Sequence, residues 1–293
     1  MKIAVIGDLM LDQYDFCRNR INPESSASCY RVERTEYKPG GAGNVAANLI
    51  KLGEDILLVG LVGDDGNARI LLESLDRLKI PHKTIKDGNM PTIVKQRILS
   101  ETDGRYHLRL DRESTKYLHE NHVAEVIAAI QGCDLIIVSD YRKGMISQGL
   151  MDELKKTKKR ILVDAKPEHK DFYKGVFMIK PNINEAREMA GLKHEIEAAE
   201  KLRDELKTNV LLTRSEEGIS YFGLNGERCD FPTSARKVVD ITGAGDTVIA
   251  TFAHFLAKNY PVRECVRLAN KAAGIAVGYP GCYAISEEEV LKE

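Results

Sequence analysis

The stretch Asp240-Ile-Thr-Gly-Ala-Gly-Asp246 constrains the fold of this chain more than any other. An apolar run follows it at once, in which Val248, Phe252 and Phe255 have the spacing of one helix face. The Gly-Ala-Gly turn is therefore predicted at a helix N-terminus, where backbone N–H groups lack partners and the helix dipole is positive. Such a terminus suits an anion, and glycine lets the backbone approach it closely.

Asp246 is predicted in the first turn of that helix, beside the anion. Because bound phosphate repels a carboxylate, an acid at this place indicates a chemical role, which is to take the proton from a hydroxyl that attacks a phosphoryl group. The alternative is a plain helix cap, because Asp is common in first turns and Gly-x-Gly alone is a weak motif. This stretch by itself leaves both interpretations open.

Composition narrows the class of protein. The 293 residues carry a formal net charge of -1, which gives no electrostatic reason to expect nucleic acid or an acidic membrane as partner. No apolar run approaches the ~18 residues of a membrane span. The six cysteines are scattered without a Cys-x-x-Cys pair and no signal-peptide pattern is present, so we expect a cytoplasmic protein with free thiols. His119-x-x-His122 lies in a polar segment and is interpreted as solvated surface rather than as a metal-ligand pair.

Strand-like and helix-like patterns alternate along the chain. The first strand is predicted at Lys2–Ile6 and is expected to end at Gly7-Asp8. Further strands are predicted at 55–62, 135–138, 161–163, 176–179 and 210–213, with helices at 44–52, 68–78, 123–130, 149–156, 185–190, 196–206 and 247–256. This order predicts an α/β protein, a single domain over residues 1–293, with a mostly parallel sheet covered by helices on both faces.

Two regions, about residues 12–37 and 91–111, break the alternation. The second contains two strand-like runs joined by a polar turn with Asp103-Gly104. We expect a small β-sheet outside the main one, acting as a lid over a substrate or as a contact between subunits; the alternative is an edge hairpin. Exposed strand edges favour a homodimer joined through these strands.

Polar residues follow several predicted strands, at the sheet edge where ligands bind in open α/β folds. They include Asp8 and Asp12, Asp140, Tyr141 and Lys143, Asp164, Lys180, and Thr213 and Arg214. Carboxylates there accept hydrogen bonds from sugar hydroxyls, while Lys and Arg suit phosphate.

Asn182-x-x-Glu185 follows Pro181 and is predicted to begin a helix. Both side chains suit Mg²⁺ and its waters beside a polyphosphate, but the same pair is also half of a capping box. The chain has no Gly-x-x-x-x-Gly-Lys-Ser/Thr loop, which excludes a P-loop enzyme. Gly40–Gly43 comes after the predicted lid segment rather than after a strand, which disfavours a dinucleotide-dependent oxidoreductase.

Together these motifs resemble the ribokinase-like (PfkB) carbohydrate kinases. Gly40-Gly-Ala-Gly-Asn44 with Asn48 and Gly53 resembles their first signature, and Asp240-x-Thr-Gly-Ala-Gly-Asp246 their second. Asn182-x-x-Glu185 resembles their magnesium and phosphate motif. The resemblance runs from Lys2 to about Ser286 and implies a three-layer α/β/α fold.

Within that family the likeness is to the D-glycero-β-D-manno-heptose 7-phosphate kinases, which occur alone or as the kinase part of a bifunctional kinase/adenylyltransferase. The residues behind it are 7–12, 31–37, 91–100, 109–111, 139–144 and 180–182. It implies phosphorylation of O1 of the heptose by Mg²⁺-ATP, for ADP-heptose precursor synthesis. Asn22-Pro-Glu-Ser-Ser-Ala-Ser-Cys29 departs from the proline-rich pattern of these kinases, and Arg142 stands where a small or neutral residue is commoner.

The resemblance also implies roles for residues. Asp246 is similar to the catalytic base, and Gly243, Ala244 and Gly245 to the anion hole. Lys180, Asn182 and Glu185 match the Mg²⁺-ATP positions, with Glu185 reaching the metal through water. The nucleotide candidates are Thr213, Arg214, Ser215, Gly218, Asn270, Ala273 and Gly274. The sugar candidates are Asp12, Gly40, Gly41, Asn44 and Asp140, and the candidates for the acceptor's own phosphate are Lys95, Arg97, Arg109 and Lys143. Asp240 and Thr242 are candidates for a monovalent cation such as K⁺.

Two other functions are alternatives to a heptose 7-phosphate kinase. Another sugar or nucleoside kinase of the same family, ribokinase-like or fructokinase-like, shares every motif above. A non-catalytic nucleotide- or sugar-binding relative is disfavoured, because such a protein has no need of a base beside an anion hole.

Overall fold

The computed structural model describes residues 1–113, 118, 120–235 and 237–292. Its main sheet has the strand order β12-β11-β10-β9-β8-β7-β1-β3-β4, and β1, β3, β4, β7, β8, β9 and β10 run parallel. The strands are β1 (Lys2–Arg20), β3 (Asp55–Gly63), β4 (His82–Asp87), β7 (Leu135–Ser139), β8 (Arg160–Asp164), β9 (Met178–Lys180), β10 (Asn209–Thr213), β11 (Ile219–Phe222) and β12 (Arg228–Phe231). The last two strands are antiparallel and extend one edge of the sheet.

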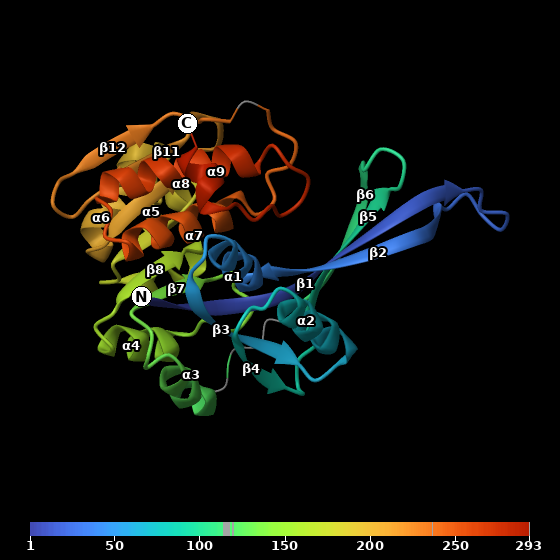
Figure 1. Ribbon diagram of the computed structural model, residues 1–293, viewed down its shortest axis with the longest axis horizontal. Coiled ribbons are helices and arrows are strands. Elements are labelled where there is room, and N and C mark those ends of the chain that lie inside the picture. The colour runs from blue at the N-terminus through green and yellow to red at the C-terminus, as the bar shows by residue number, and fades with distance from the viewer. Residues whose placement is uncertain (114–117, 119, 236, 293) are drawn as a thin grey trace.

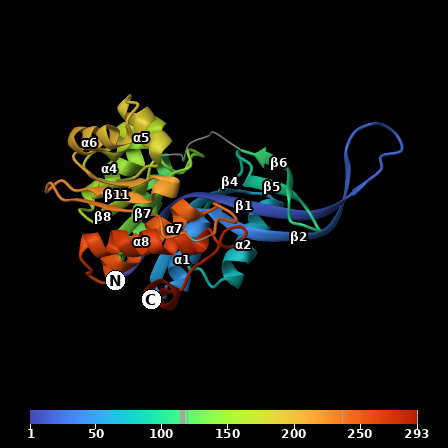
Figure 2. The same ribbon diagram turned by 90° about the horizontal axis from the view of Figure 1, so that it is seen from above.

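Helices cover both faces of this sheet (Figures 1 and 2). One face carries α1 (Ala42–Lys51), α2 (Gly66–Arg77), α7 (Ala244–Ala257), α8 (Val262–Ala276) and α9 (Glu287–Leu291), and the other carries α3 (Val123–Ala129), α4 (Gln148–Lys156), α5 (Ile183–Ala190) and α6 (Glu195–Leu206). Successive strand residues alternate between the two cores: Ile3 and Val5 belong to the first, Ala4 and Ile6 to the second. The predicted three-layer fold is confirmed.

Strand β1 belongs to two sheets. Lys2–Asp8 pairs with β3 and β7, whereas Leu9–Arg20 pairs with β2 (Cys29–Gly41) and β5 (Ile93–Ser100). β6 (Tyr106–Arg112) pairs with β5. We call Leu9–Arg20, β2, β5 and β6 the projecting sheet, because it extends away from the helical body (Figure 1).

The expectation that the first strand ends at Gly7-Asp8 is wrong. Gly7 has extended backbone and lies against β7, where a Cβ would overlap the carbonyl oxygen of Ser139. The glycine therefore permits close strand pairing rather than a turn. Gly40-Gly41 likewise ends a strand, since β2 continues to Gly41.

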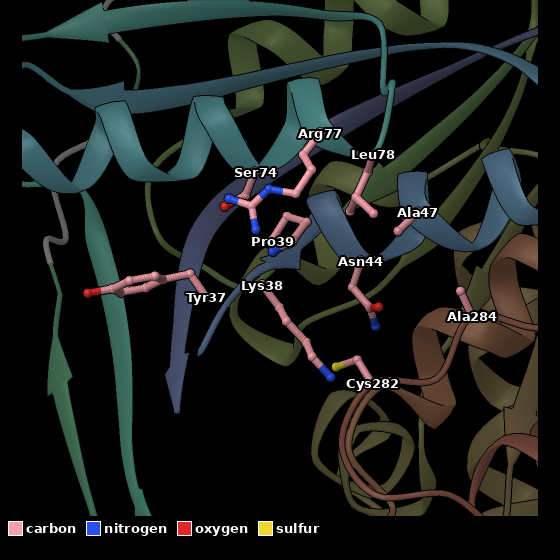
Figure 3. Close-up of a pocket in the computed structure, with 10 residues that line it drawn as sticks. All are labelled: Tyr37, Lys38, Pro39, Asn44, Ala47, Ser74, Arg77, Leu78, Cys282 and Ala284. Carbon is pink, nitrogen blue, oxygen red and sulfur yellow. The ribbon is translucent and has the colours of Figure 1, made fainter. Parts of the chain in front are cut away.

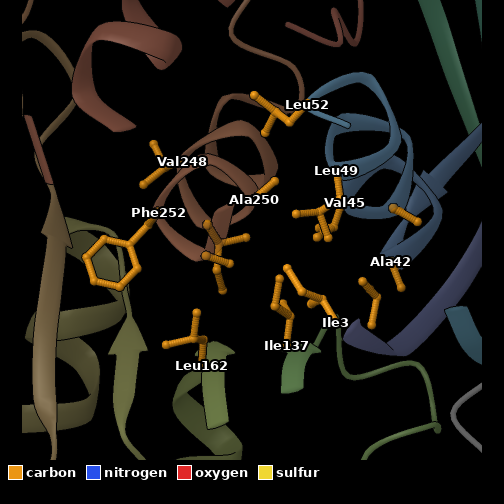
Figure 4. Packing of buried hydrophobic residues seen from close by; sticks show 14 of the residues in the cluster. Ile3, Ala42, Val45, Leu49, Leu52, Ile137, Leu162, Val248, Ala250 and Phe252 are labelled. Atoms are coloured by element: carbon orange, nitrogen blue, oxygen red, sulfur yellow. The ribbon is translucent and has the colours of Figure 1, made fainter. Parts of the chain in front are cut away.

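Helices α1 and α7 lie side by side over the sheet (Figure 4). Val45 and Leu49 of α1 and Val248 and Phe252 of α7 are buried above Ile137 and neighbouring strand residues. This packing brings the N-termini of both helices to one place beside the carboxyl ends of the strands. Elements β4, β11, β12, α8 and α9 were not predicted from the sequence. No helix among the described residues is long and apolar enough to cross a membrane.

Candidate active site

Asp246 lies in the first turn of α7, buried at the meeting point of α1, α7 and the loop after β7. Its carboxylate accepts hydrogen bonds from Asn44 Nδ2 at 2.6 Å and from the Tyr141 hydroxyl at 2.9 Å. Burial, together with the charge of Asp164, raises the pKa of Asp246 to about 7, although both hydrogen bonds and Lys180 lower it. A carboxyl group with this pKa is suited to accept a proton near neutral pH.

The Gly-Ala-Gly turn has the predicted position, with Gly243 as N-cap and Ala244 as first residue of α7. Gly243 has a φ of 78°, and a Cβ there would lie 2.6 Å from Asn44 Nδ2 and 3.1 Å from Cys282 Sγ. A Cβ on Gly245 would lie 3.1 Å from Lys180 Nζ. The turn thus presents a positive helix end next to a lysine ammonium, an arrangement suited to a phosphoryl group.

Two lysine–carboxylate pairs flank this helix end. Lys180 Nζ is 2.9 Å from Asp164 Oδ1, and both side chains are almost fully buried. Lys166 pairs with Glu185. Although burial lowers the pKa of Lys166, Glu185 raises it above its ordinary value, so Lys166 is a cation at neutral pH.

Asn182 and Glu185 form a full capping box at the start of α5. Asn182 Oδ1 accepts the Glu185 N–H at 2.9 Å, and Glu185 Oε2 accepts the Asn182 N–H at 2.8 Å. The capping interpretation is therefore confirmed. A second role in holding metal-bound phosphate stays a prediction; Glu185 Oε1 faces Lys166 rather than the helix.

The sugar candidates lie where the projecting sheet meets α1. Arg97 donates to Asp12 Oδ1 at 2.6 Å, and both residues are buried. A Cβ on Gly40 would overlap Asp12 Oδ2, and Gly41 is the N-cap of α1, with a φ of 59°. Asp12, Gly40 and Gly41 thus lie at one end of α1, and Asn44 of the same helix binds Asp246.

The remaining acceptor candidates differ in their surroundings. Lys95 Nζ lies 5.4 Å from the ring centroid of Tyr141, whose hydroxyl binds Asp246. Arg109 is exposed and bound to Asp111 at 2.9 Å, and Lys143 is bound to Glu113 at 2.6 Å.

Asp140 is fully buried below the site. Its carboxylate accepts hydrogen bonds from Tyr173 at 2.6 Å and from the Arg142 backbone at 2.7 Å, and it lies 2.7 Å from His169 Nδ1. These contacts use both carboxylate oxygens of Asp140, and its contact with the sugar stays a prediction.

The nucleotide candidates form two groups. Thr213, at the end of β10, bridges to Asn182, while Arg214 binds Glu217 and Ser215 begins a short 3-10 turn. Gly218, Asn270 and Gly274 all lie against residues 231–235: Asn270 Nδ2 donates to the Pro232 carbonyl at 2.7 Å, and a Cβ on Gly274 would overlap Ser234. Ala273 packs against the core.

Asp240 and Thr242 form a tight turn before α7. Asp240 Oδ1 accepts the Thr242 N–H at 2.9 Å and its hydroxyl at 2.7 Å, and Oδ2 accepts the Gly281 N–H at 2.9 Å. Although burial raises it, the pKa of Asp240 is lowered overall by these hydrogen bonds. The described residues include no group of three or more His, Cys, Asp or Glu side chains placed to hold a metal ion. His119 of the His119/His122 pair lies outside the described residues.

Two important site residues had no role predicted from the sequence. Tyr141 was noted only as following a strand, yet its hydroxyl contacts Asp246. Asp8 accepts the backbone N–H groups of Tyr141, Lys143 and Met145 at 2.8 to 2.9 Å, and so fixes that loop. The available signal for Asp8 was a carboxylate directly after a predicted strand, but only the fold shows which loop it holds.

A hollow of about 240 Å³ opens beside the site, between α1, α2 and residues 282–284 (Figure 3). Asn44, Lys38 and Cys282 lie along its edge, and Ala47 and Leu78 give it an apolar wall. Figure 3 shows Lys38 extended toward Cys282.

Comparison with known proteins agrees with this geometry. Residues 1–289 match the pfkB family of carbohydrate kinases. The bifunctional proteins HldE of Actinobacillus succinogenes and Trichlorobacter lovleyi are each 36% identical over 99% of this chain, which spans 62% of their length.

Solved structures share the fold at lower identity. Phosphofructokinase-2 from Escherichia coli in complex with potassium has a TM-score of 0.83 at 18% identity, covering 100% of this chain and 97% of that chain. Ribokinase from Thermotoga maritima has a TM-score of 0.78 at 22% identity, covering 98% and 97%. Because residues 1–289 match the family, and because the chain has the ribokinase-like fold and both glycine signatures, the chain belongs to the pfkB family of carbohydrate kinases.

Proposed function

We propose that the chain transfers the γ-phosphoryl group of ATP to O1 of D-glycero-β-D-manno-heptose 7-phosphate, a step in ADP-heptose precursor synthesis. The observation that carries the proposal is the position of Asp246: a buried carboxylate with a pKa near 7, at a helix N-terminus and beside Lys180. The 36% identity to the HldE proteins supports the choice of a heptose phosphate over other sugars.

Asp246 accepts the proton of the attacking hydroxyl in this mechanism. Asn44 and Tyr141 hold its carboxylate in place, which keeps the base oriented before the acceptor arrives. The backbone N–H groups at Gly243–Gly245 and the Lys180 ammonium stabilise the charge on the phosphoryl group as it transfers. Asp12, held by Arg97, binds a sugar hydroxyl.

Magnesium fits the oxygen donors near α5. Glu185, Asn182 and Asp164 supply carboxylate and amide oxygens, which Mg²⁺ prefers, and Glu185 would act through water. When bound, Mg²⁺ would neutralise charge on the ATP phosphates. We place the nucleotide along Thr213–Gly218 and against Asn270, Ala273 and Gly274, and a monovalent cation such as K⁺ at the Asp240–Thr242 turn.

The projecting sheet is proposed as both a lid and a dimer contact. Its face opposite Asp12 exposes Val32, Leu108 and Leu110 to 51%, 50% and 47%. Three half-exposed apolar side chains on one face of this sheet favour a second copy of the chain as their cover.

The test is product analysis after the protein is incubated with Mg²⁺-ATP and a library of sugars and sugar phosphates. Mass spectrometry should find one added phosphate on heptose 7-phosphate, and ³¹P NMR should place it on O1. Preferred turnover of ribose, fructose or fructose 6-phosphate would replace the heptose assignment with another carbohydrate kinase activity. A lack of product from every acceptor would contradict catalysis altogether.

A further inference from the structure

The hydroxyl of Tyr14, on β1 of the projecting sheet, has no hydrogen-bond partner among the described residues although the residue is only 5% exposed. Leaving a buried hydroxyl unsatisfied costs about 1–3 kcal/mol. Burial and neighbouring Cys282 and Asp12 raise the pKa of Tyr14, so the group is a protonated donor at neutral pH. A buried donor without a protein partner indicates that an atom of a bound ligand accepts its hydrogen bond.

Lys38 lies next to this hydroxyl. It faces Asp12 across the β1–β2 pairing, and its Nζ is 5.5 Å from the Tyr14 ring centroid. Arg109 and Lys143, predicted to bind the acceptor's phosphate, are neutralised by Asp111 and Glu113. Lys38 forms no ion pair with any residue that the structure describes, and its charge is therefore available to an anion.

Gly281 lies next to both groups. A Cβ on this glycine would lie 3.6 Å from Lys38 Nζ and 3.8 Å from Tyr14 Oη. Its N–H is fixed on Asp240 Oδ2 at 2.9 Å, so the backbone there is held in place. Both groups therefore lie within 4 Å of the same point beside Gly281, close enough together for one phosphate group to contact both.

The position of Tyr14 and Lys38 favours the acceptor, rather than ATP, as the ligand that they bind. Tyr14 and Lys38 are on the face of the projecting sheet that carries Asp12 and Arg97, whereas the proposed nucleotide residues lie on α5, α8 and the turn after β10. Lys95, which also belongs to this face, lies over Tyr141 at the reacting end. Lys38 flanks Asp12 on the opposite side from Lys95, across the β1–β2 pairing.

We propose that Tyr14 Oη and Lys38 Nζ, which both lie next to Gly281, bind the phosphate that the acceptor already carries. This inference rests on the proposed function and deepens it: it makes the enzyme selective for sugar phosphates over free sugars. Neutral hydroxyls gain less from an unpaired ammonium than a phosphate dianion does.

The experiment compares Tyr14→Phe and Lys38→Met with the wild type by calorimetric titration of heptose 7-phosphate and of the same heptose without phosphate. We expect the wild type to prefer the phosphorylated sugar. Each variant should reduce that preference roughly 10- to 100-fold, the loss expected for one charge-assisted hydrogen bond, with binding of free heptose and of ATP unchanged. Lys86→Met, on exposed β4, is the matched control and should keep the wild-type preference.

A wild type without phosphate preference, or variants that retain it, would overturn the subsite. The same titrations with fructose 6-phosphate and fructose separate the two proposals. Preference for fructose 6-phosphate that disappears in both variants would support the subsite while the heptose assignment fails. No binding of either phosphorylated sugar would overturn both. Tyr14→Phe removes an atom without a protein partner, so normal folding is expected.

Discussion

At the scale of single residues, the site depends on a base whose proton affinity is set by its surroundings. Asp246 is excluded from water and lies near Asp164, which favours its neutral form, while Asn44 and Tyr141 favour its charged form. Changes to any of these groups should therefore alter the chemistry more than the fold.

Replacing the base tests its role directly. Asp246→Asn should keep ATP binding close to that of the wild type and reduce kcat by roughly 10²-fold or more, because the proton acceptor is lost while the shape is kept. Steady-state kinetics and ATP titration measure the two quantities. Near-normal turnover in this variant would end the assignment of Asp246 as base.

The pH dependence provides a second test. The carboxylate form is the active one, so kcat/KM should fall about tenfold per pH unit below a midpoint near pH 7 and reach a plateau above it. Because the Tyr141 hydrogen bond lowers the pKa of Asp246, Tyr141→Phe should move this midpoint to higher pH. A midpoint that stays constant or moves down would show that another group controls the profile.

At the scale of elements, α7 must start within contact of α1. Gly243→Ala should reduce kcat roughly 10²-fold, since the added Cβ would displace Asn44 from Asp246. Gly226→Ala is the matched control: Gly226 also has positive φ, at 83°, but a Cβ there meets open space. Gly226→Ala should lose about 1 kcal/mol of stability from backbone strain and Gly243→Ala at least as much, but only Gly243→Ala should lose activity. Equal activities would mean that the Asn44 contact is dispensable.

The sequence predicted the elements with strong local signals and missed those defined by distant partners. The helix after Gly245 and the buried strands follow from periodicity and glycine placement. Strand β1 was predicted too short, because Gly7-Asp8 has the local pattern of a turn, while the pairing with β2 and β5 depends on residues far along the chain. The contacts of Tyr141 and Lys38 likewise depend on long-range packing that no local pattern encodes.

At the scale of the whole molecule, the exposed apolar face of the projecting sheet should decide the oligomeric state. Leu108→Asp with Leu110→Asp should convert a dimer to monomers, because charges in the contact would lose their hydration. Sedimentation velocity measures the change. Leu224→Asp, an equally exposed leucine in the β11–β12 turn, should leave the dimer intact. A wild-type monomer would refute the dimer proposal.

Strand β1 has one more consequence. A lid that is joined to its domain through loops can rotate about those loops. The projecting sheet, in contrast, continues strand β1, whose first part is hydrogen-bonded inside the main sheet. Any tilt of it must bend that strand near Asp8, whose carboxylate holds the Tyr141 loop. The stiffness of one continuous backbone thus links the seating of an acceptor on the outer strands to the alignment of the base.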